Sequence, residues 1–76
     1  MVKMVGVESS NIKQIGYDEE RKELFVRFLN EALYVYEKVP ETVFSEFLKA
    51  ESKGKFLIRE IKNVYTFRKL VDVGNQ

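Results

Sequence analysis

Residues 24–36, with the sequence LFVRFLNEALYVY, decide the fold of this chain. The segments 24–29 and 33–39 both alternate large apolar side chains at a period of two, which is typical of β-strands. Because only residues 30–32 separate the two segments, they predict an antiparallel hairpin.

Two registers of this hairpin are open. A two-residue loop would pair Leu29 with Ala32, whereas a three-residue loop would pair Leu29 with Leu33 and place Tyr34 opposite Phe28. We favour the longer loop, because it gathers the aromatic residues of both strands on one face. That face would carry Leu24, Val26, Phe28, Tyr34 and Tyr36.

Outward from the hairpin, residues 11–17 predict a preceding strand, and the charged residues 18–22 predict the turn that follows it. Gly16 indicates a bulge or the close approach of another backbone. Residues 1–7 show no clear partner. Pro40 lacks an N–H group for a sheet and therefore ends the strand region.

Pro40 also suits the first turn of a helix. An apolar stripe follows at helical spacing, and a helix should end near residues 50–53 with Gly54 as its C-cap. The stripe consists of Val43, Phe44, Phe47 and Leu48. Residues 55–62 fit a second helix capped by Ser52, although their alternation fits a strand nearly as well; we favour the helix. Residues 65–67 fit a last short strand or an extended segment.

These elements predict an α+β fold with two layers. A three-stranded antiparallel meander is followed by one or two helices packed on one face of the sheet. We expect a single domain over residues 9–70, with a flexible N-terminus at residues 1–8 and a flexible tail at residues 71–76.

Composition restricts the chemistry of this chain. The 76 residues include no Cys, His or Trp. This excludes disulfides, thiolate and histidine catalysis and the usual zinc sites, so we expect no enzyme, no cofactor and no metal. No signal segment and no long uncharged run is present, so we expect a cytoplasmic protein without membrane contact.

Several motifs resemble the KTSC domain in their order and spacing, over about residues 9–70. They are Ile15-Gly16-Tyr17-Asp18, Leu24-x-Val26-x-Phe28, Tyr34-Val35-Tyr36, Val39-Pro40 and Ala50-Glu51-Ser52-Lys53-Gly54, followed by Ile61 and Tyr65. That family occurs alone in bacteria and phages and at the C-terminus of some lysyl-tRNA synthetases. The resemblance implies a possible role in RNA binding and assigns Tyr34 and Tyr36 to the central Y-x-Y positions. Glu31 stands where the family pattern implies a hairpin glycine.

The net charge of +1 conceals an uneven distribution. Residues 1–48 carry six basic and nine acidic groups, and residues 49–76 carry seven basic and three acidic groups. The basic third predicts a surface for RNA or another polyanion, although a solvated helical face explains it without any partner. The candidate residues are Lys49, Lys53, Lys55, Arg59, Lys62, Arg68 and Lys69.

Tyr34 and Tyr36 have two interpretations. Aromatic side chains on a sheet can stack on nucleobases, but a domain this small needs its aromatics in the core. The core interpretation is favoured, since the helices should cover this face.

The opposite face of the hairpin is more apolar than a solvated face requires. It carries Phe25, Leu29, Leu33 and Val35. This set predicts, as the alternative function, a surface for a protein partner or for a homo-oligomer.

Overall fold

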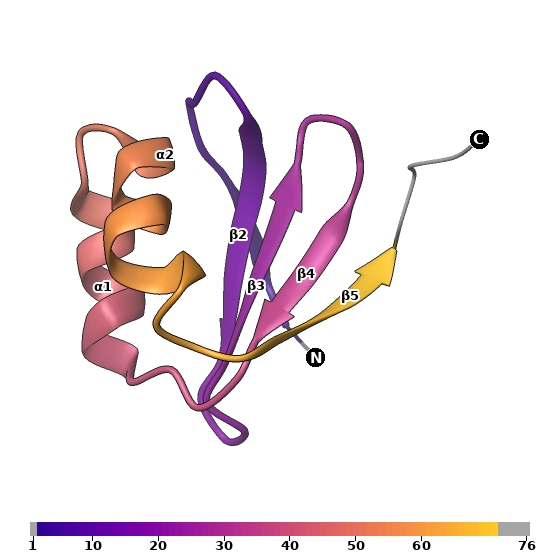
Figure 1. Ribbon diagram of the computed structural model, residues 1–76, viewed down its shortest axis with the longest axis vertical. Helices are drawn as coiled ribbons and strands as arrows, with labels where there is room; N and C mark the ends of the chain where they lie inside the picture. Colours follow the sequence, from indigo (N-terminus) through magenta and orange to yellow (C-terminus); the bar gives the residue numbers. More distant parts are fainter. Residues whose placement is uncertain (1, 72–76) are drawn as a thin grey trace.

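Five strands form one antiparallel sheet, and two short helical segments pack against one of its faces (Figure 1). This is a computed structural model, which describes residues 2–71. The strands follow the order β1-β2-β3-β4-β5, so each strand pairs with its neighbours in sequence. The elements are β1 (Met4–Gly6), β2 (Ile12–Asp18), β3 (Glu23–Phe28), β4 (Leu33–Tyr36), α1 (Glu41–Lys49), α2 (Lys53–Phe56), the π-helical segment η1 (Leu57–Lys62) and β5 (Phe67–Val71).

The α+β class and the antiparallel meander are confirmed, but the sheet has two strands more than the three predicted. The first of them is β1, within a segment for which the sequence showed no clear partner. Met4 pairs with Gly16 of β2, and a Cβ at Gly16 would lie 2.9 Å from the carbonyl oxygen of Lys3. Gly16 therefore marks the close backbone approach expected of it, and the approaching backbone belongs to the N-terminal segment.

The second additional strand is β5, which pairs with β4. The sequence indicated β character only at residues 65–67, whereas the strand runs over Phe67–Val71. Val71 was predicted to lie in the flexible tail, and it pairs with Leu33 instead. The remainder of that predicted tail, residues 72–76, lies outside the described residues.

The hairpin between β3 and β4 has the predicted face but not the predicted register. Val26 lies opposite Tyr34, whereas the favoured register placed it opposite Tyr36. The loop still has three residues, 29–31, because the Phe28 N–H donates to the Ala32 carbonyl at 2.9 Å. Glu31 has a φ of 76° in this loop. A shift of two residues leaves every side chain on its own face, so the grouping of the apolar residues survives.

The helical region matches the preferred interpretation. Residues 55–62 are helical, and the Ser52 side chain accepts a hydrogen bond from the Lys55 N–H at 3.2 Å, as a cap should. The predicted C-cap is wrong. The first helix ends at Lys49, with Ala50 in an extended conformation, and Gly54 lies inside α2. A Cβ at Gly54 would lie 3.2 Å from Oδ1 of Asn11, so a tight contact explains this glycine.

The core lies between the helices and the β2–β3–β4 part of the sheet. Phe47 of α1 is fully buried and stacks on Phe56 with ring centroids 5.3 Å apart. On the same side of the sheet the core includes Ile12, Ile15, Leu24, Val26, Tyr36, Val39, Leu57 and Ile61. Leu48, predicted as part of the buried stripe, is 37% exposed. The helices stand near β2, and β5 lies at the far end of the sheet (Figure 1).

Candidate functional site

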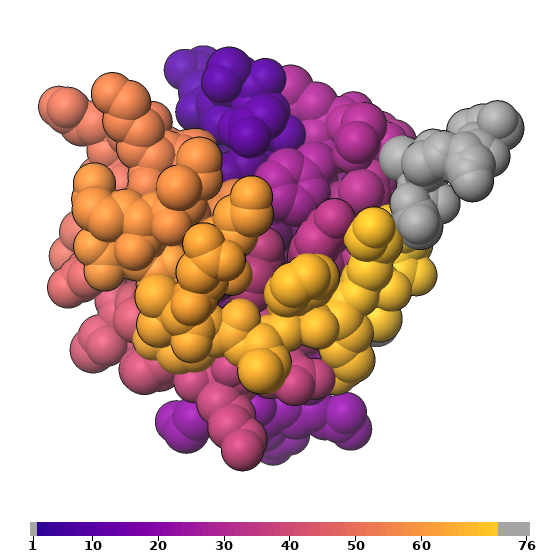
Figure 2. Space-filling model, in the orientation of Figure 1, coloured from indigo at the N-terminus to yellow at the C-terminus, as the bar shows by residue number. Residues whose placement is uncertain are grey.

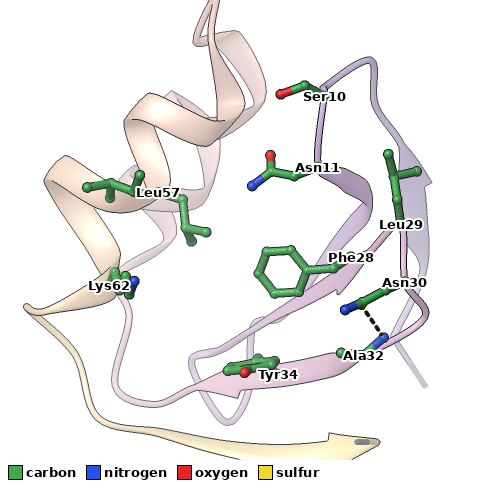
Figure 3. Close-up of a pocket in the computed structure, with 10 residues that line it drawn as sticks. Ser10, Asn11, Phe28, Leu29, Asn30, Ala32, Tyr34, Leu57 and Lys62 are labelled. Carbon is green, nitrogen blue, oxygen red and sulfur yellow. Dashed lines mark hydrogen bonds between the residues drawn. The ribbon is translucent and has the colours of Figure 1, made fainter. Parts of the chain in front are cut away.

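A groove separates the π-helical segment η1 from the β3–β4 hairpin. Its volume is about 520 Å³. Side chains from three parts of the fold surround it (Figure 3). Its lining consists of Ser10, Asn11, Phe28, Leu29, Asn30, Ala32, Tyr34, Leu57, Ile58 and Lys62.

The aromatic rings beside this groove form a continuous series. The ring of Phe28 meets that of Tyr34 edge to face at 5.3 Å, and Phe67 of β5 stacks on the other side of Tyr34 at 5.2 Å. Phe67 is 49% exposed. Figure 2 shows the magenta surface of the hairpin open between the orange helical region and yellow β5. We call Phe28, Tyr34 and Phe67 the aromatic series.

Two of the predicted cationic residues lie beside the aromatic series. Lys62 lines the groove from η1, opposite the hairpin. Lys69 approaches from β5, and its Nζ lies 5.4 Å from the centre of the Tyr34 ring, which is a cation–π geometry. The site therefore combines flat apolar rings with positive charge on both sides.

Three of the other predicted cations surround a second hollow on the helical side of the molecule. Lys49, Lys55 and Arg59 line it, together with the carboxylates of Glu46 and Glu51. Because acidic groups share this hollow and Arg59 is paired with Glu60 at 2.9 Å, the hollow offers a phosphate less net attraction than the number of its cations suggests.

Lys53 and Arg68 are the remaining predicted cations. The ammonium group of Lys53 donates to the Ala50 carbonyl at 2.6 Å. Arg68 pairs with Glu37 at 2.9 Å and with Glu23 at 3.4 Å. Arg68 lies opposite Val35, on the sheet face away from the helices. The seven predicted cations are thus divided among four places and do not form one surface.

The two tyrosines of the Y-x-Y motif have different environments. Tyr36 is 2% exposed and belongs to the core. Tyr34 is half-buried and has its ring in the groove. The core interpretation therefore describes Tyr36, whereas Tyr34 packs against the core and stays partly exposed in the groove.

Burial of Tyr36 has a consequence for alkaline stability. Burial, helped by the neighbouring Tyr34, raises the pKa of Tyr36 from 10.0 to about 12. The folded state thus favours the neutral phenol of Tyr36. This preference stabilises the folded state fully below pH 10, and the stabilisation is lost as the pH rises towards 12. We expect Tyr36→Phe to flatten this part of the curve of unfolding free energy against pH, measured by urea denaturation. Identical alkaline slopes for the two proteins would contradict this.

The apolar set predicted for a protein interface is only partly accessible. Val35 is fully buried, and Phe25 and Leu33 are half-buried. Leu29 is 53% exposed, but it lies in the hairpin loop beside the groove. These four residues therefore do not form one exposed patch.

Sequence reasoning missed part of the groove and one ring of the aromatic series beside it. Asn11, Asn30 and Phe67 were not among the predicted site residues. Asn11 precedes β2, Asn30 lies in the hairpin loop, and Phe67 begins β5. The pairing of β4 with β5 brings Phe67 against Tyr34. No short-range pattern in the sequence predicts that pairing.

Two features are absent from the part of the chain that the structure describes. No helix within residues 2–71 is long and apolar enough to cross a membrane. In the same range, no three acidic, Cys or His side chains form a group that could hold a metal ion.

The fold and the groove define a class of small α+β domain. An antiparallel sheet is only partly covered by its helices, and the uncovered part carries stacked aromatic rings. The sequence profile of the KTSC domain matches residues 8–65. The chain therefore belongs to the KTSC domain family.

Relatives of this chain agree with that assignment. A protein of Tsukamurella paurometabola is 46% identical over 54 residues, which cover 71% of this chain and 81% of that protein. A lysine–tRNA ligase of Nostoc punctiforme is 35% identical over 63 residues, which cover 83% of this chain and 11% of the ligase. The crystal structure of a KTSC domain protein from Yersinia pestis superposes with a TM-score of 0.90 at 35% identity, over 93% of this chain and 100% of that one.

Proposed function

We propose that this chain is a binding module for single-stranded RNA and has no catalytic activity of its own. The observation that carries the proposal is the aromatic series with Lys62 and Lys69 beside it. Exposed rings stack on bases, and neighbouring cations attract the phosphates that join them. The same combination gives a role to Phe67, an exposed aromatic ring on β5.

One relative of this chain also supports the proposal. A lysine–tRNA ligase contains a segment similar to most of this chain. A protein with that name acts on an RNA, so an RNA-binding appendage would be of use to it. The groove also suits a single strand better than a duplex, because stacking on Tyr34 and Phe67 requires bases that are not already paired.

The test is a titration of fluorescently labelled single-stranded RNA of mixed sequence, followed by anisotropy at about 50 mM salt. We expect saturable binding that weakens as salt increases, because each neutralised phosphate releases counterions. Absence of binding at this salt concentration would refute the proposal, and so would binding that does not respond to salt.

Removal of one charge locates the phosphate contacts. Lys62→Gln should raise the dissociation constant and reduce the salt slope by about 0.7, the value for one phosphate contact on a single strand. Lys49→Gln is the matched control, since it removes the same charge at the second hollow. Equal losses in the two variants would show that general charge, and not the groove, attracts the RNA.

Self-association or protein binding through the other sheet face stays the alternative proposal. It now depends chiefly on Phe25 and Leu33, which are the half-buried members of the predicted set. Sedimentation at tens of micromolar tests it, with Phe25→Glu as the variant. A wild-type chain that sediments as a monomer would leave only a different protein as the partner.

A further inference from the structure

We infer that the groove selects uracil among the pyrimidine bases, an inference that depends on the proposed RNA-binding function. Its basis is the set of polar atoms that the lining presents. Two asparagine amides stand at the groove, Asn11 beside β2 and Asn30 in the hairpin loop. An amide can present either a donor or an acceptor, so its orientation decides which base it suits.

The amide of Asn30 is oriented by the backbone of the loop. The Ala32 N–H donates to its side chain at 3.0 Å (Figure 3). A backbone N–H can only donate, so its partner must be the acceptor Oδ1. The NH2 group, Nδ2, is therefore the atom left for a ligand.

The amide of Asn11 is oriented by Ser9. The Ser9 hydroxyl oxygen accepts from two backbone N–H groups, those of Asn11 at 3.3 Å and Ile12 at 3.2 Å. Its own proton is then directed to Oδ1 of Asn11 at 3.1 Å. Within residues 2–71, neither asparagine Nδ2 has a hydrogen-bond partner.

The groove thus presents two amide hydrogen-bond donors, the Nδ2 atoms of Asn11 and Asn30. Uracil carries two carbonyl acceptors, and its single N–H can donate to the hydroxyl of Ser10 or Tyr34 in the lining. Cytosine has similar size and stacking surface, but it carries an amino group in place of the O4 carbonyl and an unprotonated acceptor nitrogen in place of the N3–H group. That amino group would face a donor, and the cost of an unpaired polar group lowers the affinity.

The experiment compares oligo(U) with oligo(C) of equal length, by anisotropy at about 50 mM salt. We expect oligo(U) to bind about tenfold more tightly, the size of one good polar discrimination. Asn30→Asp should reduce that ratio to one or below, because the carboxylate keeps the acceptor for Ala32 and turns the donor into a second acceptor. Asn11→Asp should act in the same direction.

Asn63→Asp is the matched control. Asn63 is exposed at the end of η1 and lies outside the groove lining, so the same change of charge should preserve the tenfold ratio. A thermal melt of each variant verifies folding.

Equal affinity for oligo(U) and oligo(C) would overturn the inference and leave the proposed RNA binding intact. An unchanged preference in both aspartate variants would also overturn it. Failure to bind either oligonucleotide would overturn the proposed function itself.

Discussion

Phe47→Ala is expected to remove most of the stability of this domain. Truncation of a fully buried phenylalanine costs about 3–5 kcal/mol, because apolar contacts are lost and a cavity is left. A chain of this length should have a total stability of roughly 4–11 kcal/mol. Phe47 also supports Phe56, the last residue of α2 before η1, so its loss should detach the η1 side of the groove. Urea denaturation followed by circular dichroism measures the effect.

Leu48→Ala provides the control for Phe47→Ala. It lies next in the same helix and is 37% exposed, so the urea midpoint should move far less. Equal shifts for the two variants would contradict the packing described here, since they would mean that helix propensity and not burial sets the cost.

Phe67→Ala is expected to weaken the binding of single-stranded RNA by about tenfold or more. One base stacked on an aromatic ring contributes about 1–3 kcal/mol, and Phe67 is the most exposed ring of the aromatic series. Its 49% exposure means that truncation should have little effect on folding. Anisotropy titration with the mixed-sequence RNA gives the two dissociation constants.

Two variants establish that the ring itself is required. Phe67→Tyr keeps a ring and should retain binding close to that of the wild type. Leu70→Ala removes an equally exposed apolar side chain from the same strand and should also retain it. If Leu70→Ala weakened binding as much as Phe67→Ala, general apolar contact along β5 would replace stacking as the explanation.

Much of the fold could be predicted from local patterns. The alternation in residues 24–36 predicted a hairpin with the right residues on its core face, and Ser52 marked the start of the second helix correctly. The sequence did not predict the two additional strands, because β1 has only three residues and because β5 consists of exposed charged and apolar side chains without alternation. β5 also depends on pairing with β4, a strand that is distant in the sequence.

The candidate site was predictable only in its parts. The sequence singled out Tyr34, Lys62 and Lys69 but placed the cations in a single basic third of the chain. The structure divides those cations, since Arg68 pairs with two glutamates and Lys53 with a carbonyl group. Tertiary contacts decide which charges lie near an exposed aromatic ring, and the amino-acid composition does not predict these contacts.

The central claim is that the groove beside η1, and no other surface, binds single-stranded RNA. An NMR titration of the wild-type chain with mixed-sequence single-stranded RNA tests it most directly. We expect chemical shifts to change chiefly at Phe28, Tyr34, Phe67 and Lys62, while those around Lys49, Glu51 and Lys55 stay constant. Shifts centred on the second hollow or on the Arg68 face would contradict the account, as would a spectrum that RNA leaves unchanged.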